Sequence, residues 1–144
     1  RRPGLHHRGV RRMKTNELID AALDWAVAKC EGIEINIDNL YDPPTKAGVV
    51  LRYGLDDGDV ECLFQPSTDW SQGGPIIELE EITLAWGKDT EDWWACVGDS
   101  RRFDTDTPDG VTTFVDPQPL IAAMRCYVAS KLGDEVEIPE GLEL

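Results

Sequence analysis

The chain has 144 residues, of which 41% are hydrophobic and five are tryptophan, and this length suits one domain with a hydrophobic core. Its 28 acidic and 14 basic residues give a formal net charge of −14, which argues against a broad face that binds nucleic acid. No apolar run reaches the roughly 18 residues of a membrane span, so we expect no membrane association and a location in the cytoplasm.

The N-terminal stretch RRPGLHHRGVRR differs in charge from the rest of the chain. It holds five arginines and both histidines but no acidic residue, whereas the other 132 residues carry 9 basic and 28 acidic side chains, a net charge of −19. We interpret residues 1–12 as a disordered or non-native basic tail, residues 13–138 as a single domain and residues 139–144 as an acidic C-terminal tail. A basic arm that binds nucleic acid is the alternative interpretation of the first segment.

The stretch TNELIDAALDWAVAKCEG predicts a helix from Asn16 to Cys30. Thr15 or Asn16 is a suitable capping residue, and Gly32 is suited to the left-handed conformation that follows a helix. One face of this helix is apolar and includes Trp25, which we expect to anchor the core.

The next part of the chain predicts a connection and a hairpin. A short strand is expected at Ile33–Ile37, and GVVLRYG and VECLF are expected to pair around the turn LDDGD. The three aspartates of that turn favour solvent contact over a cation site, because no regular ligand spacing follows them.

The stretch STDWSQGGPIIE predicts a loop over Ser67–Pro75. The following IIELEEITLAW and WWACVG are both strand candidates. Residues 98–113 are polar and turn-rich and are expected to form a surface loop, because Pro108 and Val115 break the resemblance to a calcium loop.

The last predicted helix begins after Asp116, which is a suitable cap, and ends at Gly133. Its stretch PLIAAMRCYVASKLG places apolar side chains on one side at helical spacing. The order helix, strands, helix predicts an α+β fold in which two helices pack on one face of a small antiparallel sheet.

The Ser67–Pro75 loop is the candidate ligand-binding site. Its polar side chains donate and accept hydrogen bonds, its tryptophan offers a flat apolar plate, and its two glycines allow close approach of the backbone. The candidate ligand-binding residues are Ser67, Thr68, Asp69, Trp70, Gln72, Gly73 and Gly74. The alternative is a purely structural turn in which Ser67 and Asp69 bond their own backbone and Trp70 enters the core.

The residue inventory argues for binding over catalysis. From Met13 onward there is no histidine, which removes the usual nucleophile–histidine pairs and histidine metal sites, and we expect no cofactor and no metal. A carboxylate-based hydrolase that uses acids among Asp69, Glu78, Glu80 and Glu81 is the remaining enzymatic hypothesis.

Three stretches together resemble the NinX-type proteins of tailed phages and prophages: ELIDAALDWAVAKCEG, STDWSQGGPIIE and PLIAAMRCYVASKLGDEVEIPE. The resemblance covers most of residues 13–140 and implies a phage or prophage protein of a bacterial cytoplasm, with no catalytic residue or cofactor to transfer. The leading hypothesis is a noncatalytic accessory protein that binds a host protein or a small ligand, and a homodimer is a further expectation. The alternative hypothesis is a counter-defence protein that sequesters a nucleotide signal or mimics nucleic acid.

Overall fold

The computed structural model describes residues 10–39, 49–54, 61–98, 113–140 and 142. The predicted α+β class is confirmed, with α-helices and small antiparallel sheets in one chain. In chain order the elements are β1 (Val10–Lys14), a 3₁₀ turn η1 (Thr15–Glu17), α1 (Asp20–Glu31), β2 (Asn36–Asn39), β3 (Val49–Gly54), β4 (Glu61–Leu63), α2 (Trp70–Leu79), β5 (Ile82–Gly87), β6 (Asp92–Val97), β7 (Phe114–Asp116), α3 (Pro119–Leu132) and β8 (Glu135–Pro139).

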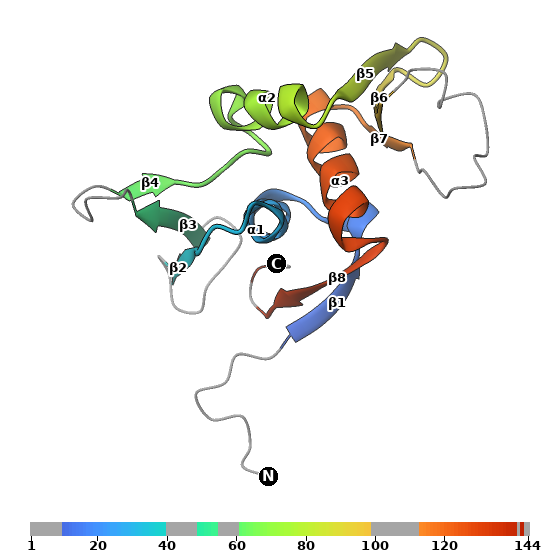
Figure 1. The fold of residues 1–144 in the computed structure, drawn as a ribbon. Coiled ribbons are helices and arrows are strands. Elements are labelled where there is room, and N and C mark those ends of the chain that lie inside the picture. Colours follow the sequence, from blue (N-terminus) through green and yellow to red (C-terminus); the bar gives the residue numbers. More distant parts are fainter. Residues whose placement is uncertain (1–9, 40–48, 55–60, 99–112, 141, 143–144) are drawn as a thin grey trace.

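Helix α3 lies at the centre of the molecule (Figure 1). All its residues from Leu120 to Val128 are buried, because α3 contacts α1 and also strands β5, β6 and β7. Burial around the whole circumference is typical of a helix in such a position. The buried Arg125 is satisfied, since its Nε donates to Leu18 O at 2.8 Å and its Nη1 donates to Asp116 Oδ1 at 3.1 Å.

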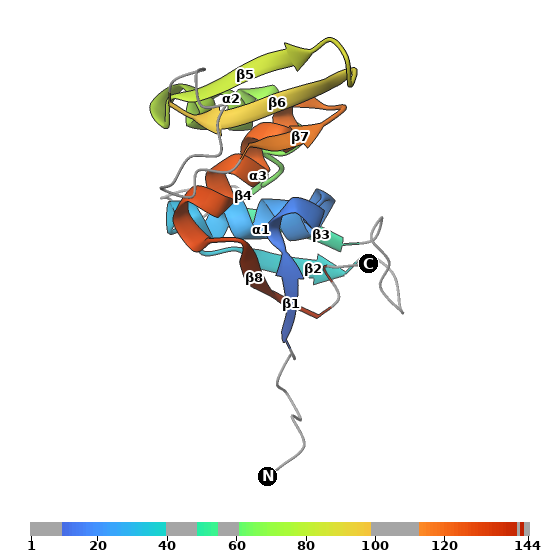
Figure 2. The ribbon, with the colours of Figure 1, turned by 90° about the vertical axis from the view of Figure 1, so that its right-hand side faces the viewer.

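The strands of the described residues form three antiparallel sheets, in the orders β5-β6-β7, β2-β3-β4 and β1-β8. Figure 2 shows the β5-β6-β7 sheet at one end of the molecule and the β1-β8 ribbon at the other, with α1 and α3 between them. The predicted hairpin is confirmed as β3 and β4. Its turn, residues 55–60, and residues 99–112 of the predicted surface loop lie outside the described residues.

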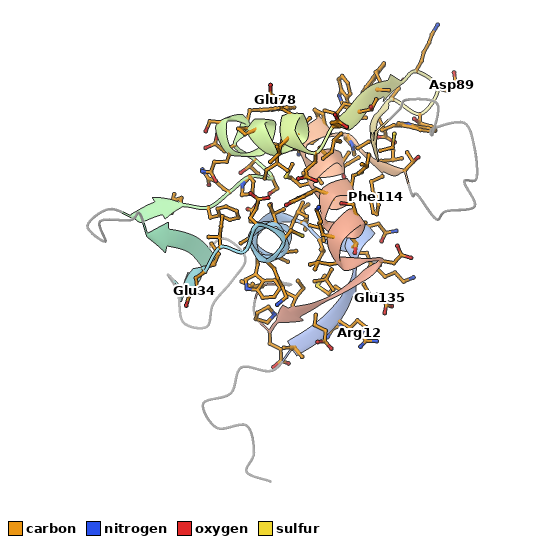
Figure 3. The ribbon with its side chains drawn as sticks, viewed as in Figure 1. Arg12, Glu34, Glu78, Asp89, Phe114 and Glu135 are labelled. Carbon is orange, nitrogen blue, oxygen red and sulfur yellow. The ribbon has the colours of Figure 1, made fainter. Side chains whose placement is uncertain are left out.

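The β1-β8 ribbon pairs a strand from the N-terminal part of the sequence with a strand from the C-terminal part. Val10 pairs with Pro139 and Lys14 pairs with Glu135, so residues 10–12, predicted to belong to the basic tail, form part of a strand. The ribbon buries Ile138 against the helices and exposes Arg12, whose Nη2 lies 3.5 Å from Glu137 Oε2. Figure 3 shows Arg12 and Glu135 on the outer side of this ribbon.

The C-terminal ends of the two predicted helices lie where their glycines predict, whereas their N-terminal ends differ from the predicted caps. Gly32 ends α1 in the left-handed conformation at φ 71°, and Gly133 follows the last residue of α3. The first helix begins at Asp20, four residues later than predicted, because Thr15–Glu17 forms the 3₁₀ turn. The Thr15 hydroxyl, expected as a cap, instead donates to Gly133 O at 2.6 Å.

The region between β4 and β5 differs most from the prediction. Trp70–Pro75 of the expected Ser67–Pro75 loop and the first residues of the strand expected after it form helix α2, whereas Ser67 and Thr68 lie in the turn before it and β5 begins only at Ile82. The part of the chain that the structure describes therefore contains a third α-helix, which packs on α3 and β5.

Candidate functional site

The seven candidate residues lie in the turn before α2 and in the first half of that helix. Asp69 is the N-cap: its Oδ1 accepts hydrogen bonds from the Ser71 amide at 2.9 Å and the Ser71 hydroxyl at 2.7 Å. These hydrogen bonds lower the pKa of the exposed Asp69 carboxyl. Asp69 therefore acts as a structural cap that keeps its charge at the helix N-terminus.

Gln72 connects the start of α2 to the preceding strand. Its Oε1 accepts from the Gln65 amide at 2.9 Å, and its Nε2 donates to Leu63 O, also at 2.9 Å. Both ends of the side-chain amide are thus used within the protein. The proposed ligand-binding role of Gln72 gains no support from this geometry.

Ser67 is buried, with 1% of its surface exposed, and its amide donates to Asp24 Oδ1 of α1 at 2.8 Å. Burial raises the pKa of Asp24 to about 7, and the hydrogen bonding to Ser67 opposes part of that rise. The Ser67 hydroxyl has no hydrogen-bond partner of good geometry among the described residues. Ser67 and Asp24 therefore form a buried polar contact that ties the turn before α2 to α1.

The two glycines have different roles. A Cβ atom at Gly73 would lie 2.4 Å from Pro66 O and 2.6 Å from Leu120 Cδ1, so glycine is what lets α2 approach α3 closely. At Gly74 a Cβ atom would have no such neighbour within 4 Å. Gly74 precedes Pro75, and a residue without Cβ there avoids the clash that disfavours helical backbone before proline.

Trp70 is the candidate that remains available for contact. It is 52% exposed, on the first turn of α2, and does not enter the core as the structural alternative required. Gly74 and Ile77 follow it at helical spacing on the same side of α2, and Ile77 packs partly on the core. We call Trp70, Gly74 and Ile77 the α2 face, and exposed Thr68 lies just before it in the chain.

The carboxylates considered for a hydrolase do not form one cleft. Asp69 caps α2, Glu80 Oε1 lies 3.4 Å from Lys131 Nζ, and Glu78 and Glu81 are exposed. Figure 3 shows Glu78 directed away from the body of the molecule.

Two surface hollows lie elsewhere. One of about 910 Å³ is lined by residues of β1, β7 and β8 with their neighbours, and one of about 370 Å³ lies between α1 and β8. Neither contains a candidate residue. Among the described residues, no group of three histidine, cysteine or acidic side chains is placed to hold a metal ion. No described helix has the length and apolar character needed to cross a bilayer.

Sequence reasoning did not identify Asp24 as a residue of interest, whereas it considered Trp86 together with Trp93 and Trp94 and favoured core or partner-contact roles for them. Trp86 is 51% exposed at the end of β5, and Asp24 is buried on α1. The position of Asp24 between Leu23 and Trp25 is a usable signal, since a carboxylate among core positions of a helix needs a partner.

Comparison with protein families matches residues 14–131 to the family described as Bacteriophage P22, NinX. The matched range includes α1, α2 and the β5-β6-β7 sheet and leaves out β8. A comparison with curated proteins found no match.

Proposed function

The chain belongs to the NinX family of bacteriophage proteins, and we propose that it is a noncatalytic accessory protein that binds a protein of the bacterial host through the α2 face. The observation that carries this proposal is the half-exposed Trp70 on a helical turn fixed by an N-cap. Tryptophan is the side chain most enriched among residues that dominate binding energy, because it buries a large rigid area on contact.

The local hydrogen bonds support a rigid binding surface. Asp69 and Gln72 hold the first turn of α2, and Ser67 fixes the preceding turn to α1. A side chain presented on a fixed backbone loses less conformational entropy when a partner covers it. The backbone that carries Trp70 is therefore held in place before the partner arrives.

A protein partner fits this geometry better than a small ligand. Small-ligand sites are concave and present a few polar groups toward the ligand. Here Gln72 and the Ser67 amide direct their hydrogen bonds into the protein, and Trp70 stands on the outer side of a helix. Such a convex face suits a groove on another protein.

The test compares tagged wild-type protein with Trp70→Ala and Trp70→Phe in capture experiments from host cell extract, with quantitative mass analysis. Truncation to alanine is expected to weaken capture of the partner roughly thirtyfold, equivalent to about 2 kcal/mol, and phenylalanine is expected to restore part of it. Circular dichroism of each variant checks that α2 is intact.

Leu79→Ala is the matched control on the same helix. Leu79 is 76% exposed and lies nine residues from Trp70, on roughly the opposite side of α2. This variant is expected to capture the partner as wild type does. A folded Trp70→Ala protein that captures the same host proteins in the same yield would show that the α2 face is not the binding surface.

A further inference from the structure

We propose that the β5-β6 hairpin carries a second interaction surface, on which Trp86 and Trp93 receive an arginine side chain from a basic segment of a partner protein. These tryptophans are cross-strand neighbours in the β5-β6 register. Their ring centroids lie 5.4 Å apart with an angle of 61° between the rings, an edge-to-face arrangement. The surface is separate from the α2 face and does not depend on it.

The tryptophan pair occupies the uncovered end of a core-facing sheet surface. Alternation along the strands puts Trp86 and Trp93 on the same face as Ile82, Ala95 and Phe114, which are buried toward α3. Burial decreases along this face toward the hairpin tip, until Trp86 is 51% exposed. Figure 3 places Phe114 inside the body and Asp89 at the tip of the hairpin.

The hairpin end has a fixed shape. Trp94, on the opposite sheet face, donates from Nε1 to Thr90 Oγ1 at 3.1 Å, and the Glu91 amide donates to Gly87 O at 2.7 Å. A Cβ atom at Gly87 would lie 2.3 Å from Trp94 Nε1, so glycine allows the indole to lie against the turn. The pair of half-exposed Trp86 and partly buried Trp93 is thus held on a preorganised support.

The turn between β5 and β6 carries a net negative charge. Residues 88–92 contain Lys88 and three acids, Asp89, Glu91 and Asp92. The ion pairs within the described ranges involve Arg12, Arg125 and Lys131, and none reaches these three carboxylates. Glu91 has a φ of 57°, a conformation that glycine or asparagine adopts more easily, so glutamate occupies this position at a local cost in backbone energy.

Arginine is the side chain that fits both the tryptophan pair and the negative charge of the adjacent turn. Indole is the best aromatic acceptor of a cation, and a guanidinium can stack on the ring while its N–H groups face carboxylates. The chain's net charge of −14 also attracts basic partners over longer distances. An apolar patch alone would not select a positive charge, whereas this pair flanks a turn with the exposed acids Asp89 and Glu91, and Asp92 lies at the start of β6 on the opposite sheet face.

The test measures binding of a fluorescent hexa-arginine peptide by anisotropy to wild type, Trp86→Leu and Trp70→Leu. Both substitutions leave the charge unchanged, and both replace tryptophans of nearly equal exposure, 51% and 52%. Trp86→Leu is expected to weaken binding about three- to tenfold, and Trp70→Leu less than twofold. Equal affinities for the two variants would show that only net charge attracts the peptide and would overturn the proposal.

Glu91→Gly separates binding from folding. Glycine relieves the backbone at this position while it removes one charge, so the hairpin stays folded, and affinity is expected to fall about twofold at low salt. The Trp86 indole N–H resonance should also shift on peptide addition. An unshifted resonance, or equal affinity for a neutral peptide of the same length, would rule out an arginine site at Trp86.

Discussion

Asp24 is a buried carboxyl whose protonation state should set much of the pH dependence of stability. Burial raises its pKa from 3.8 to about 7 in the folded protein. Between these values the unfolded chain has released a proton that the folded chain retains, so stability falls as pH rises, by about 1.4 kcal/mol per pH unit. The loss is complete above pH 7.

Asp24→Asn should abolish this loss, because asparagine stays neutral while its Oδ1 still accepts from the Ser67 amide. We expect the variant to unfold at a higher temperature than wild type at pH 8 and at a similar temperature near pH 4. Asp89→Asn, at an exposed position, controls for the change in net charge. Parallel curves of melting temperature against pH for wild type and Asp24→Asn would contradict the role given to Asp24.

The site could be predicted only in part at the level of single residues. The residue types of Asp69, Trp70 and Gly73 marked them as candidates. In the structure Asp69 caps α2, Trp70 is half-exposed, and Gly73 allows close packing of α2 on α3. Which of them faces outward depends on how α2 docks on α3. That docking involves Leu120, about 50 residues later in the chain, so no local pattern contains it.

Helix α2 contains residues of low helix propensity, so single substitutions in it should change the stability of the protein measurably. Pro75 lies inside the helix and is exposed, so it removes an amide donor without adding buried contact. Pro75→Ala is expected to stabilise the protein by about 1–3 kcal/mol. Gly73→Ala is expected to destabilise it by a similar amount, because the added methyl would collide with Pro66 O and Leu120.

Urea unfolding followed by tryptophan fluorescence measures both changes in α2. Opposite signs for these two neighbouring substitutions are the expected result. A stabilising Gly73→Ala would mean that α2 stands farther from α3 than the structure shows.

The same features explain why α2 was predicted as a loop. Gly73, Gly74 and Pro75 all have low helix propensity, and an aspartate that bonds the amide two residues later occurs both in turns and at helix starts. Tertiary packing of Gly73 and Ile76 decides between these structures. At α1 and α3, by contrast, apolar periodicity and a following glycine agree with the packing, so both helices could be predicted.

At the scale of the whole molecule, the β1-β8 ribbon should behave as part of the core. Ile138 is fully buried, so Ile138→Ala is expected to lower the free energy of unfolding by about 2–4 kcal/mol. Glu137→Ala, on the exposed side of the same strand, removes only an ion pair with Arg12 and should cost less than about 1 kcal/mol. Equal, small effects in urea unfolding would show that the ribbon frays independently.

The β1-β8 ribbon could not be predicted from the sequence. Its two strands are separated by more than one hundred residues, and the arginines of β1 suggested a solvated tail. Register is defined only when the partner strand is known, and here the partner has its own acidic, tail-like composition. Arg12 and Glu137 complement each other across the ribbon, a relation that neither segment reveals alone.

The pairing of Val10 with Pro139 places these two residues next to each other on one side of the molecule, at the end of the β1-β8 ribbon. That side is remote from α2 and from the β5-β6 hairpin in both views (Figures 1 and 2). A label or solid support attached through exposed Val10 would therefore leave Trp70 and Trp86 accessible, and protein immobilised in this way is a sound format for searching for partners of both surfaces.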